Sequence, residues 1–253
     1  MNNIHINVDH VSFFYDNNND KNILNDITFS AKENDSIGLI GANGVGKSTL
    51  LKILVGLNLN FQGNIEIEGT TVQKDTLSTI RKKIGYVFQD SDSQLFMSTA
   101  YDDIAFAPRN YGLPEDEVKK RVENALNLVD IQHLKNKQIY KMSGGEKKIV
   151  SIATILSMTP DIILMDEPSI ALDPKNRRNL INILNSFNQV KIIASHDLDM
   201  ILETCNRTIL LSNGKIIKDG KTIDILSDKK LLEQNNLELP LCMQETKNYI
   251  KIL

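Results

Sequence analysis

The first forty residues alternate between apolar and polar positions in short segments that are typical of β-strands. The pattern over residues 4–40 predicts several short strands, interrupted by the polar run 16–21, whose Asn and Asp residues favour an exposed turn. Residues 36–40 are almost wholly apolar, which predicts a buried strand. This run leads directly into a glycine-rich turn, and residues 47–55 then have apolar positions at helical spacing. The sequence therefore predicts a strand, a glycine loop and a helix in immediate succession.

The second half of the chain carries a similar alternation of apolar runs and helical spacing. Residues 162–165 and 190–194 are short apolar runs, and apolar residues recur at helical spacing over 180–187 between them. A strand, a helix and a second strand in this order indicate a parallel sheet. We therefore expect an α/β fold.

The region between these β-rich parts has the pattern of helices. After Pro114, acidic residues precede a set of apolar residues spaced along one helix face, which comprises Val118, Val122, Leu126 and Val129. This spacing predicts an amphipathic helix. We expect residues of about 90–149 to form a helical subdomain inserted between the β-rich halves.

The last part of the chain contains a hairpin signal. Asn213-Gly214 separates two segments, 208–212 and 215–218, and this dipeptide favours a type I′ turn. We divide the chain into a main domain over residues 1–220 and a short C-terminal extension over residues 221–253.

Composition excludes some classes of protein and leaves others open. The chain has 253 residues, of which 41% are hydrophobic and 24% charged, as in an ordinary globular protein. Its net charge of -3 gives no basic footprint for nucleic acid. The two cysteines, Cys205 and Cys242, have no spacing that suggests a disulfide framework or a zinc site. No apolar run approaches the ~20 residues that a membrane-spanning helix needs, so we expect another chain to span any membrane that this protein serves.

The glycine-rich turn matches a phosphate-binding pattern. Residues 41–48 read Gly-Ala-Asn-Gly-Val-Gly-Lys-Ser, which fits G-x-x-x-x-G-K-[ST]. Backbone N–H groups in such a loop cradle phosphates at the N-terminus of a helix. Lys47 would reach the β- and γ-phosphates, and the hydroxyl of Ser48 would ligate Mg²⁺. The predicted strand before the loop and the helix after it give the motif its expected context.

Two adjacent carboxylates end the apolar run at 162–165. Asp166 would hold Mg²⁺ through water, and a turn at Pro168 would aim Glu167 toward the γ-phosphate. Glu167 would then act as the general base that polarises the attacking water. The same three residues, taken alone, equally fit the end of a strand.

A second glycine pair precedes a helical stretch at Ser143-Gly144-Gly145-Glu146. Two glycines allow a close backbone approach, and a helix N-terminus offers unpaired N–H groups to an anion. A helix cap would explain this tetrapeptide equally well. Because the first glycine loop already serves one nucleotide, the second would serve the nucleotide of a partner subunit.

Together these motifs resemble those of an ABC ATPase, in family order and over essentially the whole chain. The order is Walker A at 41–49, the signature at 142–146, Walker B at 162–167, the D-loop at 169–173 and a switch histidine, His196. The resemblance implies a P-loop, RecA-like core with a β-rich subdomain and an inserted helical subdomain. It also implies hydrolysis of Mg-ATP by a pair of ATPase subunits.

The resemblance assigns roles to single residues. Glu167, His196 and Gln89 would be catalytic, with His196 contacting the γ-phosphate, and Asp173 would belong to the D-loop. Ser48, Gln89 and Asp166 would hold Mg²⁺. The expected ATP-binding residues are Tyr15, Gly41, Ala42, Asn43, Gly44, Val45, Gly46, Lys47, Ser48 and Thr49, with Ser143, Gly144 and Gly145 acting on the partner's nucleotide. Tyr15 would stack on adenine, although Phe13 and Phe14 are its neighbours and an aromatic residue in a strand is often part of the core.

Three positions depart from the family pattern. Met142 and Glu146 replace the usual Leu and Gln at the ends of the signature, and Ile149 stands where a basic residue is common. Met for Leu conserves volume, so we expect phosphate binding to survive.

Two further segments resemble the energy-coupling-factor branch of the family. Residues 91–96 and 101–106 are similar to the stretch in which acidic residues of that branch dock arginines of a transmembrane subunit. Here Ser93 replaces one acidic residue, which leaves Asp92 and Asp90 as the docking candidates. Each of them alone also fits a solvated acidic loop. The resemblance implies a transmembrane coupling subunit, a substrate-binding membrane subunit and a place at the cytoplasmic face of the cell membrane.

The C-terminal residues suggest a cargo. Leu239-Pro240-Leu241-Cys242 and Glu245-Thr246 resemble the end of ATPases dedicated to cobalt or nickel uptake. The chain shows no His/Cys cluster, so the metal cargo would be held by another subunit. The ATPase of a shared vitamin-uptake module is the alternative.

Three other classes of function compete with transport. A soluble ABC ATPase acting on DNA or ribosomes generally carries a coiled-coil insertion or a second ATPase domain, and neither is present. A GTPase would carry Asn-Lys-x-Asp, whereas Ile139 follows Asn136-Lys137-Gln138. A binding-only module does not need Glu167 and His196, which this chain retains. We therefore expect no nucleic-acid partner and an ATPase coupled to transport.

Overall fold

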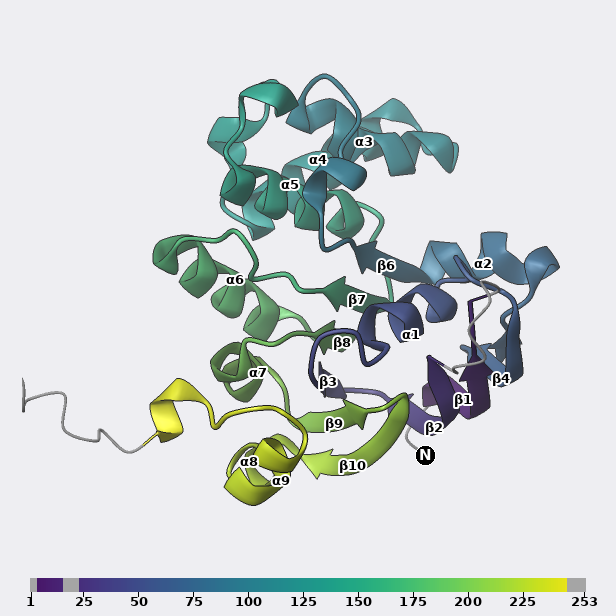
Figure 1. Ribbon diagram of the computed structural model, residues 1–253. Helices are drawn as coiled ribbons and strands as arrows, with labels where there is room; N and C mark the ends of the chain where they lie inside the picture. The colour runs from purple at the N-terminus through teal and green to yellow at the C-terminus, as the bar shows by residue number, and fades with distance from the viewer. Residues whose placement is uncertain (1–3, 16–22, 245–253) are drawn as a thin grey trace, which may run out of the picture.

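The computed structural model describes residues 4–15 and 23–244, which fold as two β-sheets with helices around them (Figure 1). The larger sheet has six strands in the order β10-β9-β3-β8-β7-β6. These strands are β3 (Ser36–Ile40), β6 (Ile84–Val87), β7 (Ile162–Asp166), β8 (Val190–Ala194), β9 (Arg207–Ser212) and β10 (Lys215–Lys221). All neighbours are parallel except β10, which is antiparallel to β9. The predicted parallel sheet and α/β fold are confirmed.

Both faces of the larger sheet are buried, as strand β7 illustrates. Ile163 and Met165 point into a core formed with the helices on one side, and Ile162 and Leu164 point into a second core on the other side. Successive side chains of a strand point to opposite faces, so a strand that is covered on both faces reads as a continuous apolar run. This explains why the sequence pattern there is unbroken.

The smaller sheet is antiparallel, with the strand order β2-β1-β4-β5. Its strands are β1 (Ile4–Phe13), β2 (Leu24–Lys32), β4 (Phe61–Ile67) and β5 (Thr70–Thr71). Helix α1 (Lys47–Leu54) buries Leu50, Leu51, Ile53 and Leu54 in the core that the two sheets share. Helix α2 (Leu77–Lys83) leads from this region into β6. The residues that link β1 to β2, including the polar run predicted at 16–21, lie largely outside the described ranges.

The other face of the larger sheet carries five helices from the middle of the chain. These are α3 (Ala100–Asn110), α4 (Glu115–Leu128), α5 (Gly144–Leu156), α6 (Pro174–Ser186) and α7 (Leu198–Thr204). Helices α3, α4 and α5 pack together as one group at the top of Figure 1, which we call the helical group. The amphipathic helix predicted after Pro114 is α4, whose Val118, Val122 and Leu126 are buried. Residue 149 lies inside α5, which continues without a break to Leu156.

The C-terminal part of the chain forms and packs against the β9-β10 end of the larger sheet. Asn213 and Gly214 have φ values of 48° and 71°, the left-handed geometry that a type I′ turn requires at both positions, so the predicted hairpin β9-β10 is confirmed. Helices α8 (Thr222–Leu226) and α9 (Lys229–Gln234) follow, and Leu232 anchors α9 in the core. A short 3₁₀ turn, Leu241–Met243, contacts α7.

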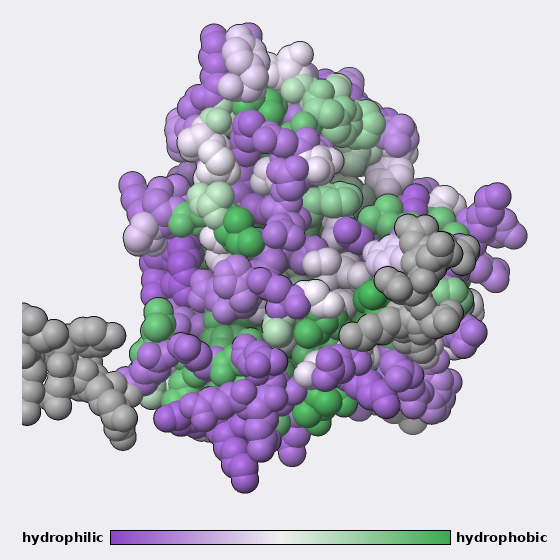
Figure 2. Space-filling view, viewed as in Figure 1, coloured by the Kyte–Doolittle hydropathy of each residue, from purple (hydrophilic) through white to green (hydrophobic). Residues whose placement is uncertain are grey.

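The surface is mixed in polarity. On the face seen in Figure 2, hydrophilic residues predominate and hydrophobic residues show in small separate patches. No helix among residues 4–15 and 23–244 is both long and apolar enough to cross a bilayer.

Candidate functional site

The motif residues gather where parallel strands of the larger sheet end. The glycine loop follows β3, Gln89 follows β6, Asp166 ends β7 and His196 follows β8. These strands are neighbours in the sheet order, and all run in the same direction. Residues from four distant parts of the sequence therefore meet at one edge, the place where open α/β sheets bind their ligands.

The glycine loop turns the chain tightly from β3 into α1. Gly46 has a φ of 109°, and a Cβ at this position would lie 2.7 Å from a methyl group of Leu24. Gly41 has a φ of 150°, and a Cβ there would lie 2.2 Å from the carbonyl oxygen of Leu211. Only glycine fits either position. The loop therefore brings backbone N–H groups to the first turn of α1, where an anion can approach them.

Lys47 is buried beneath this loop. Its ammonium group donates to the carbonyl oxygens of Gly41 (2.7 Å) and Ala42 (3.2 Å). Burial lowers the pKa of Lys47, and the nearby carboxylates of Glu167 and Asp166 act in the opposite direction. The loop thus holds a cation beside two carboxylates at the edge of the sheet.

Asp166 is the buried carboxylate of the site, with 2% of its surface exposed. It accepts a hydrogen bond from the hydroxyl of Ser48 (2.9 Å) on one oxygen and from that of Tyr86 (3.4 Å) on the other. Burial raises the pKa of Asp166, the Ser48 hydrogen bond opposes this, and Glu167 raises that pKa further. A hydroxyl and a carboxylate side by side are the oxygen ligands that Mg²⁺ prefers.

Glu167 is also buried, and its backbone has left the strand conformation. Its φ is 48°, and its N–H donates to the carbonyl oxygen of Ala194 on β8 (2.8 Å). One carboxylate oxygen accepts from the backbone N–H of His196 (3.2 Å) and from the hydroxyl of Ser195 (3.3 Å), and lies 2.7 Å from Nδ1 of His196. A left-handed backbone is costly for a residue other than glycine, so the surrounding contacts hold Glu167 in a defined orientation.

The loop that carries His196 is tied to α6. Arg177 makes a bidentate ion pair with Asp197, at 2.6 and 2.7 Å. Asp197 also caps α7 by accepting from the N–H of Met200 (2.9 Å). Asp173 caps α6 by accepting from the N–H of Asn176 (2.8 Å), and Arg177 lies one turn further along that helix. The segment after the D-loop motif and the His196 loop are therefore joined by a rigid contact.

Two adjoining cavities lie at this edge of the sheet. The first, of about 530 Å³, is lined mainly by residues that the sequence singled out, which are Tyr15, Asn43, Gly44, Gly46, Lys47, Ser48, Thr49, Gln89, Glu167 and His196. Tyr15 is half exposed, whereas Phe13 is buried in the core of the smaller sheet and makes an edge contact with the Tyr15 ring at 4.8 Å. Of these two rings, it is Tyr15 that faces the glycine loop.

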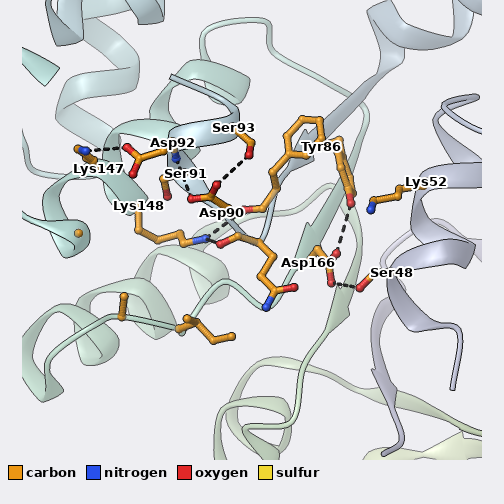
Figure 3. Close-up of a pocket in the computed structure, with 15 residues that line it drawn as sticks. Ser48, Lys52, Tyr86, Asp90, Ser91, Asp92, Ser93, Lys147, Lys148 and Asp166 are labelled. Carbon is orange, nitrogen blue, oxygen red and sulfur yellow. Dashed lines mark hydrogen bonds and ion pairs between the residues drawn. The ribbon is translucent and has the colours of Figure 1, made fainter. Parts of the chain in front are cut away.

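The second cavity, of about 600 Å³, lies between the sheet edge and the helical group and is drawn in Figure 3. It shares Ser48 and Gln89 with the first cavity and adds Asp166, Gly144 and the segment 88–93. In Figure 3, Asp166 lies between Ser48 and Tyr86, and Lys148 extends toward the same space from α5. Gln89 thus borders both cavities.

The signature residues form a helix cap. The hydroxyl of Ser143 accepts from the N–H of Glu146 (3.2 Å), and a carboxylate oxygen of Glu146 accepts from the N–H of Ser143 (2.8 Å). This is a capping box at the start of α5. Glu146 also pairs with Lys137 (2.7 Å), which keeps the pKa of Glu146 below its usual range. Ser143 and Gly145 line neither of the two cavities described above.

The acidic segment after Gln89 is held by its own contacts. Asp90 accepts from the hydroxyl of Ser93 (2.8 Å) and from the N–H of Asp92 (3.1 Å), and these bonds hold the pKa of Asp90 below its usual range. Asp92 is largely exposed and pairs with Lys147 of α5 at 2.6 Å. Any arginine that approaches Asp92 from outside therefore meets Lys147 as a competitor.

Sequence reasoning missed several residues of this site, including Tyr86, Lys147, Lys148, Arg177 and Ser195. Their partners lie 20 to 80 residues away in the sequence. Tyr86 carried a usable signal, because a tyrosine in an apolar run needs a partner for its hydroxyl. The others have no local signal that distinguishes them from surface residues.

Comparison with known proteins agrees with this geometry. Residues 24–170 match the ABC transporter family. A putative ABC transporter ATP-binding protein of Geobacter sulfurreducens is 50% identical over 221 residues, which cover 87% of this chain and 89% of the relative. The energy-coupling factor transporter ATP-binding protein EcfA of Carboxydothermus hydrogenoformans is 39% identical over 96% of this chain and 90% of its own length.

A solved structure has the same fold. CbiO1 of Clostridium perfringens, described as part of the ABC transporter complex cbiONQ, superposes with a TM-score of 0.81 at 33% identity. The match covers 94% of this chain and 96% of CbiO1. The glycine loop, the paired carboxylates and the histidine loop thus occur in a chain that matches ABC ATPases along most of its length. The chain belongs to the ABC transporter family, as an ATP-binding and ATP-hydrolysing subunit of the energy-coupling-factor type.

Proposed function

We propose that this ATPase drives an energy-coupling-factor importer for cobalt or nickel ions from the cytoplasmic face of the cell membrane. The observation that carries the ATPase part is the first cavity, where the glycine loop, Glu167 and His196 line one space of a size that suits a nucleotide. Import requires the energy of ATP to reach a membrane-embedded partner.

ATP binds with its phosphates on the N–H groups of the glycine loop and its adenine on Tyr15. The half-exposed ring of Tyr15 faces the cavity, and its edge contact with Phe13 fixes its orientation. Lys47 turns from the carbonyl oxygens of Gly41 and Ala42 to the β- and γ-phosphates. This exchange is favourable because a phosphate is a stronger acceptor for a buried ammonium group than a neutral carbonyl.

Ser48, Asp166 and Gln89 are the residues that would hold Mg²⁺. The Ser48 hydroxyl and the Asp166 carboxylate already lie within hydrogen-bond distance of each other, and both are hard oxygen ligands. When bound, Mg²⁺ neutralises negative charge on the β- and γ-phosphates. Tyr86 orients the second oxygen of Asp166.

Glu167 accepts a proton from the attacking water, and His196 contacts the γ-phosphate. Three donors converge on one oxygen of Glu167, which leaves the other oxygen available to the water. His196 is more than half exposed toward the cavity side of the sheet, so its ring can reach a phosphate while its backbone still holds Glu167. This pair divides the work of a general base and an electrostatic stabiliser.

A second ATPase subunit completes the site. Ser143, Gly144 and Gly145 lie at the N-terminus of α5, and the capping box uses only part of the donor capacity of that helix end. In the assembled pair these groups bind the γ-phosphate of the nucleotide on the opposite subunit. The D-loop lies beside them, since a Cβ on Gly144 would stand 3.7 Å from the Cβ of Ala171.

The segment 90–93 docks the transmembrane coupling subunit through Asp90 and Asp92. Asp92 is largely exposed, and its present partner, Lys147, contacts one of its carboxylate oxygens through one nitrogen atom. An arginine from the membrane subunit offers a bidentate contact that a lysine cannot make, so it displaces Lys147. The substrate-binding membrane subunit then receives the energy through the coupling subunit.

The cargo assignment is supported by the C-terminal residues and by the similarity to CbiO1. The backbone N–H groups of Leu241 and Cys242 donate to the carboxylate of Asp199 on α7, at 2.9 and 3.0 Å. The resembling segment is therefore docked on the helix that follows His196, while Glu245 and Thr246 lie outside the described residues. A shared vitamin-uptake module is the second candidate, favoured by the similarity to EcfA.

The test is uptake by membrane vesicles that carry the native complex with ATP supplied at the cytoplasmic side. Radiolabelled cobalt and nickel are compared with biotin, riboflavin and folate, and a complex with Glu167→Gln serves as the inactive control. We expect ATP-dependent uptake of a metal ion and of none of the vitamins. Uptake of a vitamin without a metal ion would overturn the cargo assignment and leave the ATPase assignment intact.

A further inference from the structure

Lys148 is the second of two adjacent lysines in α5, and it is buried with 2% of its surface exposed. Its ammonium group donates to the carbonyl oxygens of Phe88 (3.0 Å) and Gln89 (2.6 Å). Burying an ammonium group is costly unless hydrogen bonds compensate for the lost water. The position of the Phe88–Gln89 peptide is therefore fixed by an interaction that the chain cannot easily give up.

The contact joins two parts of the molecule that are distant in sequence. Phe88 and Gln89 connect β6 to the acidic segment, whereas Lys148 lies in the helix that begins at Ser143. A second link runs parallel to the first, because Gln94 accepts from the N–H of Phe88 (3.1 Å) and donates to the carbonyl oxygen of Ser151 (2.7 Å). Both links tie the Phe88–Gln89 segment to α5.

The charge of Lys148 suits its surroundings. Burial lowers the pKa of Lys148, and the carboxylates of Asp90, Asp166 and Glu167 act in the opposite direction. Asp166 and Lys148 line the same cavity, and Gln89 lies between the two cavities. A shift of Lys148 would therefore also move Gln89, which lines the first cavity beside the glycine loop.

We propose that Lys148 is a positioning residue for Gln89. Lys148 holds the backbone carbonyl group of Gln89, so that α5 and Gln89 move as one body. This inference rests on the proposed role of Gln89 at the Mg²⁺ site. Any displacement of α5 relative to the larger sheet would then carry Gln89 toward or away from Ser48 and Asp166. Hydrolysis is in this way coupled to the position of the signature residues at the start of the same helix.

The experiment compares Lys148→Met with Lys148→Arg in the full chain. Met has a similar length and cannot donate, whereas Arg restores the donors. A matched control is Lys191→Met, because Lys191 is also buried and donates to two carbonyl oxygens, those of Leu184 (2.7 Å) and Phe187 (3.0 Å), but lines neither cavity. Both Met variants are expected to lower the unfolding temperature, which controls for the loss of a buried hydrogen-bonding group.

Four quantities are measured for each variant: ATP affinity without Mg²⁺, kcat, the Mg²⁺ concentration for half-maximal hydrolysis, and amide hydrogen exchange over residues 86–95. For Lys148→Met we expect unchanged ATP affinity, a kcat lower by roughly ten- to a hundredfold, a higher Mg²⁺ requirement and faster exchange. Lys148→Arg should recover most of the loss. Lys191→Met should leave all four quantities near those of the parent chain.

Gln89→Ala separates failure of this inference from failure of the proposed function. If Gln89→Ala leaves kcat and the Mg²⁺ requirement unchanged, Gln89 has no role at the Mg²⁺ site, and both the proposed function of Gln89 and this inference are overturned. If Gln89→Ala impairs both but Lys148→Met behaves like Lys191→Met, only the inference is overturned. A double variant that carries both Lys148→Met and Gln89→Ala tests the coupling. A kcat no lower than that of Gln89→Ala alone supports it, and additive losses of kcat contradict it.

Discussion

At the scale of single residues, the site owes its chemistry to two carboxylates that differ in their partners. Asp166 stays in the strand and accepts from two hydroxyl groups, whereas Glu167 leaves the strand with a φ of 48° and accepts from the His196 loop. Neighbouring residues in a regular strand would point to opposite faces. The left-handed backbone at Glu167 brings both carboxylates to the same edge of the sheet.

Replacement of Glu167 by Gln should preserve ATP binding and nearly abolish hydrolysis. The amide keeps the shape of the side chain but cannot take up the proton of the attacking water, so we expect the rate to fall by about 10²- to 10⁴-fold. Binding of a fluorescent ATP analogue and phosphate release measure the two effects separately. Lys47→Ala is the contrasting variant, since it should weaken binding itself. Turnover near the parent rate in Glu167→Gln would remove Glu167 as the base.

At the scale of elements, the structure depends on contacts between the ends of helices and the loops of the sheet edge. The bidentate pair between Arg177 and Asp197 joins α6 to the start of α7. Its side chains are only 26% and 17% exposed, so water screens the pair less than it screens the neighbouring pair of Arg178 and Glu203, at 55% and 37%. Two adjacent arginines thus offer a test of what partial burial contributes.

Arg177→Gln should destabilise the protein by ~2 kcal/mol at pH 7, because it leaves a half-buried carboxylate without its partner. Burial by itself raises the pKa of Asp197, but the hydrogen bonds from Arg177 and from the N–H of Met200, together with the charge of Arg177, outweigh it, so that pKa lies below its usual range. Stability from this pair is therefore present above the unfolded pKa of about 4 and is lost as the pH falls through the folded pKa.

Urea unfolding of the parent, Arg177→Gln and Arg178→Gln at several pH values tests this prediction. The difference between the parent and Arg177→Gln should narrow as the pH is lowered below about 4. Arg178→Gln should stay within about 0.5 kcal/mol of the parent, as is usual for an exposed pair. Equal effects from the two arginines would show that burial of the Arg177 pair contributes nothing.

At the scale of the whole molecule, the glycine loop and the start of α5, which we propose both bind phosphate, face different places. The glycine loop opens into the first cavity, whereas Gly144 borders only the second cavity and Ser143 and Gly145 line neither. A helix N-terminus at the surface is well placed to serve a nucleotide bound to another copy of the chain. On this proposal, hydrolysis requires two copies of the chain to assemble. The dependence of the rate on protein concentration and the mixing of inactive variants both test this.

Hydrolysis should be second order in protein at low concentration, because the active species is a pair of subunits. A chain with Lys47→Ala and a chain with Ser143→Arg should each be nearly inactive. Mixed together they should regain part of the activity, since one of the two sites then combines an intact glycine loop with an intact signature. Mixtures that show only the sum of the two residual activities would indicate a self-contained site in each chain.

Asp92→Arg should leave the isolated ATPase folded and able to bind ATP, yet prevent its assembly with the transmembrane subunit. The reversed charge would repel both the incoming arginine and Lys147, and repulsion at a docking pair costs more than the loss of an exposed ion pair. Co-purification of the membrane subunit measures assembly. Asp224→Arg on α8 is the control for a charge reversal at an exposed position, and unchanged assembly in Asp92→Arg would place the joint elsewhere.

The sequence by itself determined the features that depend on neighbouring residues. The strand, glycine loop and helix at 36–55, the helix after Pro114 and the Asn213-Gly214 hairpin were all predicted, because backbone sterics and helical or strand periodicity act over a few residues. The paired carboxylates at the end of β7 were visible for the same reason.

Only the tertiary structure decided which distant residues meet. Tyr15 and not Phe13 faces the glycine loop because β1 ends at Phe13, and the carbonyl oxygens that receive Lys148 lie 59 and 60 residues away. The competitor of any docking arginine, Lys147, lies 55 residues from Asp92. Such contacts depend on how the helical group packs against the sheet, and no local pattern records that packing, because its energy is spread over many small contacts.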